Sequence, residues 1–275
     1  VHKSAEALIN TNKHLALLNG VQGSLKSIVN WANKPQDGPS CKMTIAGFGD
    51  GMTCVVFSPD GSKLASACKD CTIKILDATT GNELATLIGH SNWVVSLDFS
   101  SDGRQLVSGG WDGLIKVWDL FTYAETHNFS GHRRRISNVC FSNNGSYVLS
   151  SSWDCTLKLW SLSDHKEVRV HFKGNQRPIS SCAFSPDDKL VISGGWDGTV
   201  RVFNMDSGKQ VLVCRGGHNS SVTSVAYSPT GKHLASASRD QTVVVWDARA
   251  GRLIAQFHAH AGPVTGPARA YFTSA

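Results

Sequence analysis

The sequence predicts an all-β protein built as a propeller of repeated four-stranded units, and two observations lead to that prediction. First, alternating apolar and polar residues recur in short runs that each end in an aromatic residue, at intervals of 42 or 43 residues: Phe57, Phe99, Phe141, Phe184 and Tyr227. Second, a Ser-, Pro-, Asp- or Gly-rich segment typical of a tight hairpin follows each aromatic. A fixed period of about 40 residues indicates stacked or radially arranged units.

Each unit contains the signals of four strands in succession. In the unit that starts at residue 89, we expect a first strand over residues 94–99 and a second over residues 105–109. A turn around Asp112 leads to a β-branched third strand over residues 114–119, and a fourth strand over residues 124–129 leads to the next unit. The unit is therefore predicted to be an antiparallel meander.

The repeat divides a single domain over residues 1–275 into six recognisable blades, the first of them degenerate, and a partial or diverged seventh. The predicted boundaries are 1–46 for the degenerate blade, 47–88, 89–130, 131–173, 174–216 and 217–258 for the clear repeats, and 259–275 for the partial one. Because an open ring would leave unpaired strand edges, either the missing strands lie outside this chain or the ring closes in an unusual way. We therefore expect the chain to be part of a longer protein.

Three units share a Gly-His pair before the first strand and a Trp near the end of the third. They are Gly89-His90 with Trp118-Asp119, Gly131-His132 with Trp160-Ser161, and Gly217-His218 with Trp246-Asp247. This pattern resembles the WD40-repeat family, and the resemblance covers five units between residues 45 and 257.

The resemblance implies that the leading His, a second-strand Ser, the turn Asp and the third-strand Trp form one buried hydrogen-bonded network that stabilises each blade. The complete sets are His90, Ser108, Asp112 and Trp118; His132, Ser150, Asp154 and Trp160; and His218, Ser236, Asp240 and Trp246. Two units have lost both ends of the set: Phe48 and Leu76 stand around Asp70, and Asn175 and Phe203 around Asp197.

No catalytic residue, metal ligand or cofactor is expected. A catalytic Ser-His-Asp set would occur once with an exposed Ser, whereas this set recurs in each blade. Cys68 and Cys71 have the C-x-x-C spacing of redox and zinc sites, but no second pair completes a four-ligand set, which favours reduced thiols. The glycine-rich segment 47–51 precedes a strand instead of a helix, which favours a turn over a phosphate site.

The resemblance implies a binding face, because partners of WD40 proteins commonly bind at one end of the propeller. That end carries the turns before the third strands and the loops before the first strands. Carried over by position, the partner-binding face consists of Lys69, Trp93, Trp111, Arg133, Arg134, Arg135, Trp153, Arg177, Trp196 and Arg239. Trp and Arg are the types most enriched in binding hot spots. The alternative is that each Trp packs across a blade boundary. The insertion at residues 30–41, with Trp31, is a second candidate surface.

Composition agrees with an interaction module. The net charge of +6 is mildly basic, and the eight Cys have no framework spacing, which predicts reduced thiols in an intracellular, cytoplasmic or nuclear protein. We expect a non-catalytic scaffold or substrate-recruiting module of a larger protein or complex, with other proteins or peptides as partners and neither a membrane nor an obligate small molecule. The alternative is nucleic-acid or phospho-ligand binding through the basic, Trp- and Arg-rich face.

Overall fold

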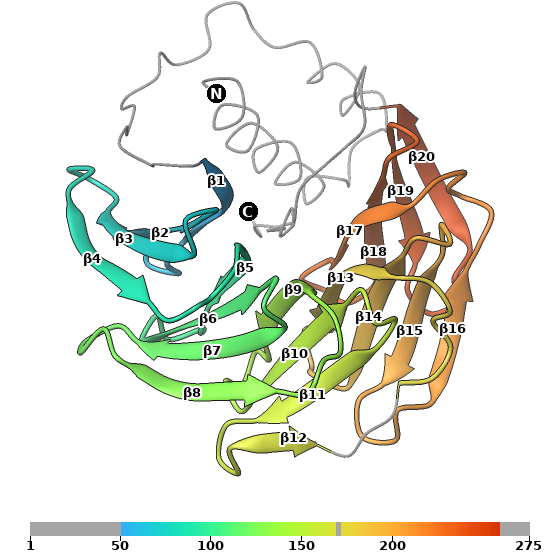
Figure 1. Cartoon of the computed structure of the whole chain (residues 1–275). Helices are drawn as coiled ribbons and strands as arrows, with labels where there is room; N and C mark the ends of the chain where they lie inside the picture. Colours follow the sequence, from blue (N-terminus) through green and yellow to red (C-terminus); the bar gives the residue numbers. More distant parts are fainter. Residues whose placement is uncertain (1–50, 169–171, 259–275) are drawn as a thin grey trace, which may run out of the picture.

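The computed structural model describes residues 51–168 and 172–258, which form strands and turns (Figure 1). The degenerate blade at 1–46, the insertion at 30–41 and the partial repeat at 259–275 lie outside the described residues. Within 51–168 and 172–258, no helix is long and apolar enough to cross a membrane.

Five four-stranded antiparallel sheets make up this part of the chain. The first contains β1 (Met52–Phe57), β2 (Lys63–Cys68), β3 (Thr72–Asp77) and β4 (Glu83–Ile88). The second contains β5 (Val94–Phe99), β6 (Gln105–Gly110), β7 (Leu114–Asp119) and β8 (Glu125–Ser130). The third contains β9 (Ile136–Phe141), β10 (Tyr147–Ser152), β11 (Leu157–Ser161) and β12 (Lys166–Val168). The fourth contains β13 (Ile179–Phe184), β14 (Leu190–Gly195), β15 (Val200–Asn204) and β16 (Gln210–Cys214), and the fifth β17 (Val222–Tyr227), β18 (His233–Ser238), β19 (Thr242–Asp247) and β20 (Leu253–His258).

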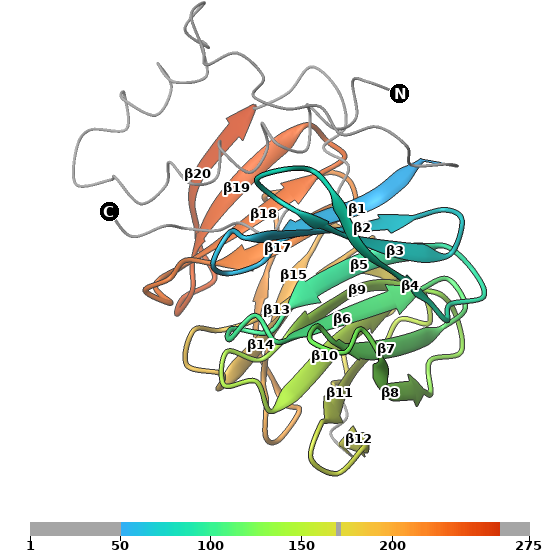
Figure 2. The same cartoon turned by 90° about the vertical axis from the view of Figure 1, so that its left-hand side faces the viewer.

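The sheets are arranged radially, with their first strands β1, β5, β9, β13 and β17 innermost and their fourth strands outermost (Figures 1 and 2). Side chains join neighbouring first strands: Asn138 donates its Nδ2–H to Ser96 Oγ at 3.0 Å, and its Oδ1 accepts the Cys182 N–H at 3.0 Å. The predicted all-β propeller of four-stranded units is confirmed.

Observed strand bounds differ slightly from the predicted ones in the second sheet. β6 is one residue longer than expected, because Gly110 pairs with Val94 beyond a register shift in β5. β8 begins one residue later than expected, because the carbonyl of Ala124 accepts the Asp119 N–H at 2.9 Å and closes the turn. Both differences arise from cross-strand register, which alternation within a single strand does not specify.

The turns between second and third strands need one residue in the left-handed region. Glycine meets this need in two sheets, at Gly113 with φ 78° and Gly198 with φ 74°. The other three sheets place Cys71, Cys155 and Gln241 there, with φ of 71°, 68° and 71°. A non-glycine residue at such a φ is disfavoured relative to glycine. The hydrogen bonds and packing of the surrounding hairpin must offset this cost.

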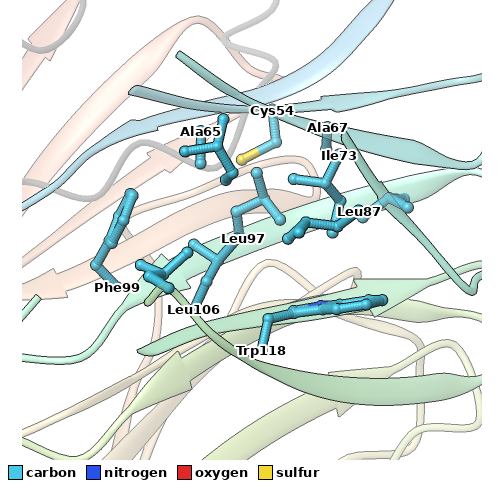
Figure 3. Packing of buried hydrophobic residues seen from close by; sticks show 12 residues of the cluster. Cys54, Ala65, Ala67, Ile73, Leu87, Leu97, Phe99, Leu106 and Trp118 are labelled. Carbon is cyan, nitrogen blue, oxygen red and sulfur yellow. The ribbon is translucent and has the colours of Figure 1, made fainter. Parts of the chain in front are cut away.

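The hydrophobic core lies between the sheets. Cys54, Ala65 and Ile73 of the first sheet pack against Leu97 and Trp118 of the second (Figure 3). Equivalent clusters join the second sheet to the third, the third to the fourth and the fourth to the fifth. Each internal sheet therefore buries both of its faces against neighbours, and the packing holds the ends of the sheets in fixed relative positions.

Candidate functional site

All ten residues predicted for partner binding lie at one end of the sheets. The meander places the turns after second strands and the loops before first strands together, opposite the turns after first and third strands. We call this end the rim, and it carries Lys69, Trp93, Trp111, Arg133, Arg134, Arg135, Trp153, Arg177, Trp196 and Arg239. The core clusters between sheets fix the spacing of these residues around the rim.

Backbone hydrogen bonds hold each rim turn against the loop beside it. The Trp111 N–H donates to the Trp93 carbonyl at 2.8 Å, and the Trp153 N–H donates to the Arg135 carbonyl at 3.1 Å. Trp196 and Arg239 make the equivalent bonds at 2.9 Å and 3.0 Å. These bonds pair backbone N–H and carbonyl groups that would otherwise be hydrogen-bonded only to water. They also limit the motion of the turns that carry the tryptophan side chains.

A row of stacked rings and cations begins at the first sheet. Lys69 Nζ lies 4.6 Å from the centroid of the Trp93 ring, which stacks on Trp111 at a centroid separation of 4.4 Å. The guanidinium carbon of Arg135 lies 4.4 Å from the Trp111 centroid and 3.2 Å from the Trp153 centroid. Arg135 is thus held between two indoles, an arrangement in which the negative ring faces attract the cation.

The row continues into the fourth and fifth sheets. Trp153 meets Trp196 edge-on, with centroids 4.6 Å apart and planes at 69°, a favoured geometry for an aromatic pair. The guanidinium carbon of Arg239 lies 5.6 Å from the Trp196 centroid. We call the seven residues the tryptophan–cation row: Lys69, Trp93, Trp111, Arg135, Trp153, Trp196 and Arg239. Its tryptophans are half-buried; Trp153 and Trp196 pack across a blade boundary, whereas Trp93 and Trp111 stack within the second sheet.

The remaining predicted rim residues lie outside the row. Arg133, Arg134 and Arg177 are exposed, and none of them forms an ion pair with another residue of the described ranges. Burial lowers the pKa of Arg135, yet a guanidinium keeps its proton in proteins. The rim therefore presents positive charge whose hydrogen-bond donors are available to an acidic partner.

The His, Ser, Asp and Trp residues of three sheets form closed networks beneath the rim. His90 joins Asp112 through Nδ1 at 2.8 Å and Ser108 through Nε2 at 2.8 Å, and Trp118 Nε1–H donates to Ser108 Oγ at 2.9 Å. The third sheet repeats this set, with His132 at 2.9 Å from Asp154 and 2.7 Å from Ser150, to which Trp160 donates at 2.8 Å.

The fifth sheet contains the same arrangement with an added threonine. His218 Nε2 lies 2.7 Å from Ser236 Oγ, which also accepts the Trp246 Nε1–H at 2.7 Å. His218 Nδ1 lies 3.2 Å from Asp240 and 2.9 Å from Thr242. The histidine side chains of all three sets are 0–1% exposed, and Ser108, Ser150 and Ser236 are buried as well.

Burial and hydrogen bonding set the charge states in the fifth-sheet network. Burial lowers the pKa of His218 below its ordinary 6.5, although Asp240 acts in the opposite direction. Burial alone would raise the pKa of Asp240, but hydrogen bonds from Thr242 and the Asn219 N–H, with the nearby His218, lower it to about 2. A neutral His218 therefore donates from Nδ1 to a carboxylate and accepts the Ser236 hydroxyl at Nε2.

Two sheets lack the complete network. In the first, Ser66 Oγ is buried with no hydrogen-bond partner among the described residues, and Phe48 lies outside them. In the fourth, Asn175 Oδ1 accepts from Ser193 Oγ at 3.3 Å and from Arg201 Nε at 3.2 Å. The part played by Arg201 was missed by sequence reasoning. The signal was present, because Arg201 occupies the repeat position of Lys74, Lys116 and Lys158.

The cysteines of the C-x-x-C motif are free thiols with different environments. Cys68 is buried and its Sγ lies 4.0 Å from the Ser66 carbonyl, whereas Cys71 is half-buried in the turn. Burial raises the pKa of both thiols, which disfavours the thiolate that redox or metal chemistry needs. Across the described part of the chain, no group of three or more His, Cys, Asp or Glu residues could hold a metal ion.

Family models match most of the described chain. The model of the IFT122 first beta-propeller matches residues 51–204, more than half of the sequence. The chain belongs to the WD40-repeat β-propeller family. A second model, the WD domain, G-beta repeat, matches residues 208–247. Members of the WD40 family are typically protein-interaction modules and are generally non-catalytic.

Individual WD40 relatives match over different extents. The nuclear distribution protein nudF of Emericella nidulans is 44% identical over 61 residues, which are 22% of this chain and 13% of that protein. The nuclear distribution protein PAC1 of Komagataella phaffii is 42% identical over 52 residues, which are 18% of this chain and 10% of that protein. The chain thus aligns with a small part of either relative.

Solved structures match over a larger share of the chain. The structure of U3-55K has a TM-score of 0.71 and 28% identity, and the match covers 78% of this chain and 66% of that one. The structure of the RRP9 WD40 repeats has the same TM-score, identity and coverage of this chain, and 65% of that chain is covered.

Proposed function

We propose that this propeller is a non-catalytic scaffold or substrate-recruiting module that binds another protein over its rim. The observation that carries the proposal is the position of Arg135 between Trp111 and Trp153, which links the second and third sheets in one preorganised surface. Preorganised aromatic and arginine side chains lose little conformational entropy on binding, and they are the residue types that dominate interface energies.

The charges of the rim favour an acidic protein surface as the partner. Arg133, Arg134 and Arg177 extend past the tryptophan–cation row and have no carboxylate partner in 51–168 or 172–258. The ring faces of Trp111 and Trp153 are already occupied by Arg135, so the row offers guanidinium edges to a ligand more readily than open indole faces. Arginine edges pair with carboxylates in a bidentate geometry.

The test is quantitative partner recovery on the immobilised protein, with rim variants compared with a variant at the opposite end. Trp111→Ala, Trp153→Ala and Arg134→Ala are expected to reduce recovery of the same partner. Arg249→Ala removes an exposed arginine in the turn between β19 and β20, away from the rim, and is expected to leave recovery unchanged. Equal recovery by all four variants would exclude the rim as the binding face.

Nucleic-acid or phospho-ligand binding is the second candidate, favoured by the same three exposed arginines, which have no ion-pair partner in the described ranges. Binding to phosphates releases counterions, so the affinity for a nucleic acid must fall steeply as salt rises. Titration of the protein with single-stranded RNA at increasing salt tests this candidate. Undetectable or salt-independent binding would remove it and leave a protein partner.

A further inference from the structure

Three sheets contain the same ion pair between their third and fourth strands. A third-strand lysine reaches across to a glutamate that is the first or second residue of the fourth strand, in Lys74–Glu83 at 2.9 Å, Lys116–Glu125 at 2.7 Å and Lys158–Glu167 at 2.5 Å. In the second and third sheets the glutamate carboxylate also lies beside the glycine that precedes the network histidine. Each of these sheets therefore supplies its own carboxylate at this place beside the rim.

The fourth sheet has a cation at the third-strand lysine position but no carboxylate at the fourth-strand glutamate position. Arg201 stands at the lysine position, and Gln210, which pairs with Phe203 in the register, stands at the glutamate position. Gln210 Oε1 lies beside Gly174, as the glutamates do beside their glycines, but it forms no hydrogen bond with Arg201 in the described part of the chain. The glutamine removes the negative charge of the fourth strand, and Arg201 keeps its ion pair with Asp197 of the preceding turn.

Arg201 is buried, with a side chain 8% exposed, and uses only part of its donor capacity. Its Nη2 donates to Asp197 at 2.6 Å and its Nε to Asn175 at 3.2 Å. Nη1 has no hydrogen-bond partner among residues 51–168 and 172–258. A guanidinium has five N–H donors, so part of the donor capacity of Arg201 is not used by the described residues and is left to solvent.

A second unpaired donor lies in the same cluster. Nδ2 of Asn175 is buried and has no partner in the described residues. Its orientation follows from the neighbours, because the Oδ1 atom accepts from both Ser193 and Arg201, and a flipped amide would place a donor against the guanidinium. The cluster thus holds a buried donor with no acceptor among the described residues, which is unfavourable.

A pocket of about 450 Å³ opens at this cluster. Arg201, Arg215, Gln176 and Gln210 line it, together with Asp197. Arg215 is exposed and makes no ion pair with the described residues, so the lining carries two positive charges against one negative charge. The pocket is therefore cationic, has neutral amide donors on its walls, and lies where the rim loops enter the fourth and fifth sheets.

We propose that this pocket binds the carboxylate of a glutamate or aspartate side chain from an acidic segment of a partner protein. The incoming carboxylate replaces the one that Glu83, Glu125 and Glu167 supply in their own sheets, and it accepts hydrogen bonds from Arg201 and Arg215. The choice of a polypeptide as the source rests on the proposed protein-binding function, whereas the carboxylate chemistry of the pocket does not.

The experiment compares three probes by titration into the isotope-labelled full chain, followed by nuclear magnetic resonance. The probes are a Gly-rich pentapeptide with a central Glu and blocked termini, the same peptide with a central Gln, and free glutarate. The Glu peptide is expected to shift the Arg201 Nε–H and Thr199 amide resonances, and the Gln peptide is expected to bind at least about tenfold more weakly, because charge-assisted hydrogen bonds are lost. Equal binding of the two peptides would overturn the proposal.

Variants locate the effect in the pocket. Gln210→Glu places a carboxylate where three other sheets already carry one, so the protein is expected to remain folded while the peptide affinity falls at least about tenfold. Arg215→Gln is expected to weaken binding as well, and Arg249→Gln, the same charge change at the opposite end, is expected to have no effect. Unchanged affinity in a folded Gln210→Glu protein would overturn the assignment.

Three further outcomes identify the source of the carboxylate and separate this inference from the proposed function. If glutarate binds as tightly as the Glu peptide, the pocket takes small carboxylates, and the polypeptide source is wrong. If the Glu peptide binds while Trp111→Ala and Trp153→Ala leave recovery of the protein partner unchanged, the pocket is supported and the rim is not. Loss of partner recovery in the two Trp variants, with no peptide binding, supports the rim and overturns the pocket.

Discussion

The guanidinium of Arg135 lies over the ring of Trp153, with its central carbon 3.2 Å from the ring centroid. The two residues come from different strand connections, since Arg135 precedes β9 and Trp153 follows β10. The contact therefore joins a loop to a turn within one blade. Arg135 also lies over the ring of Trp111, which belongs to the previous blade. This contact makes the rim continuous between the second and third sheets.

Arg135→Ala is expected to lower the free energy of unfolding by about 1–2 kcal/mol, because two cation–π contacts are lost at a half-buried position. Arg135→Lys keeps the charge but not the planar group that fits between two indoles, so it is expected to recover only part of the loss. Urea denaturation followed by tryptophan fluorescence measures both variants. Equal stability of Arg135→Ala and the unaltered protein would show that the row contributes nothing to folding.

Serines at one repeat position are expected to differ in their contribution to stability. Ser108→Ala leaves the Trp118 N–H and the His90 ring without their shared partner, and it should cost about 2 kcal/mol. Ser66→Ala removes a buried hydroxyl that has no partner among the described residues, so it is expected to leave the stability unchanged or raised. Chemical denaturation of the two variants checks the contrast, and similar losses would contradict it.

Acid is expected to destabilise the fifth sheet in two steps. Because the pKa of His218 is lowered from 6.5, the folded state resists a proton that the unfolded chain binds, and stability falls as pH drops below about 6.5. Because the pKa of Asp240 is lowered from 3.8 to about 2, its contribution is complete above 3.8 and is lost as pH falls toward 2. The stability gap between the unaltered protein and Asp240→Asn should narrow over that lower range. A gap that stays constant in urea midpoints measured down to about pH 2 would contradict the second step.

The ion pairs between third and fourth strands are expected to contribute unequally to the stability of the fold. Lys116 is 5% exposed, so Glu125→Gln leaves a buried cation unpaired and should cost about 2–3 kcal/mol. Lys74 is 23% exposed and its partner 44%, so Glu83→Gln should cost less than about 1 kcal/mol. Thermal unfolding at low and high salt distinguishes the pairs, because screening affects the exposed one more. The opposite order of losses would show that burial does not set the strength of these pairs.

Much of the fold could be predicted because its signals are local and repeated. Alternation in β5 and β7 gave their bounds as the structure has them, and turn residues marked the hairpins. The stacking of Arg135 between two indoles could not be predicted, because side-chain conformations and the approach of neighbouring sheets are not encoded by spacing alone. The role of Arg201 could not be predicted for another reason: the lysine–glutamate pairs depend on the register between two strands, which the repeated His and Trp positions do not specify.

The location of the hydrophobic clusters between sheets has a consequence for how this sequence can change. A residue such as Leu97 belongs to a cluster that includes residues of the adjoining sheet, so a substitution there can be compensated about one repeat away along the chain. Neutral drift in one blade is thus constrained by its two flanking blades. When a blade is duplicated or deleted, both faces of the new neighbouring sheets must still pack against each other. This requirement favours copies of the same repeat over insertion of an unrelated sheet.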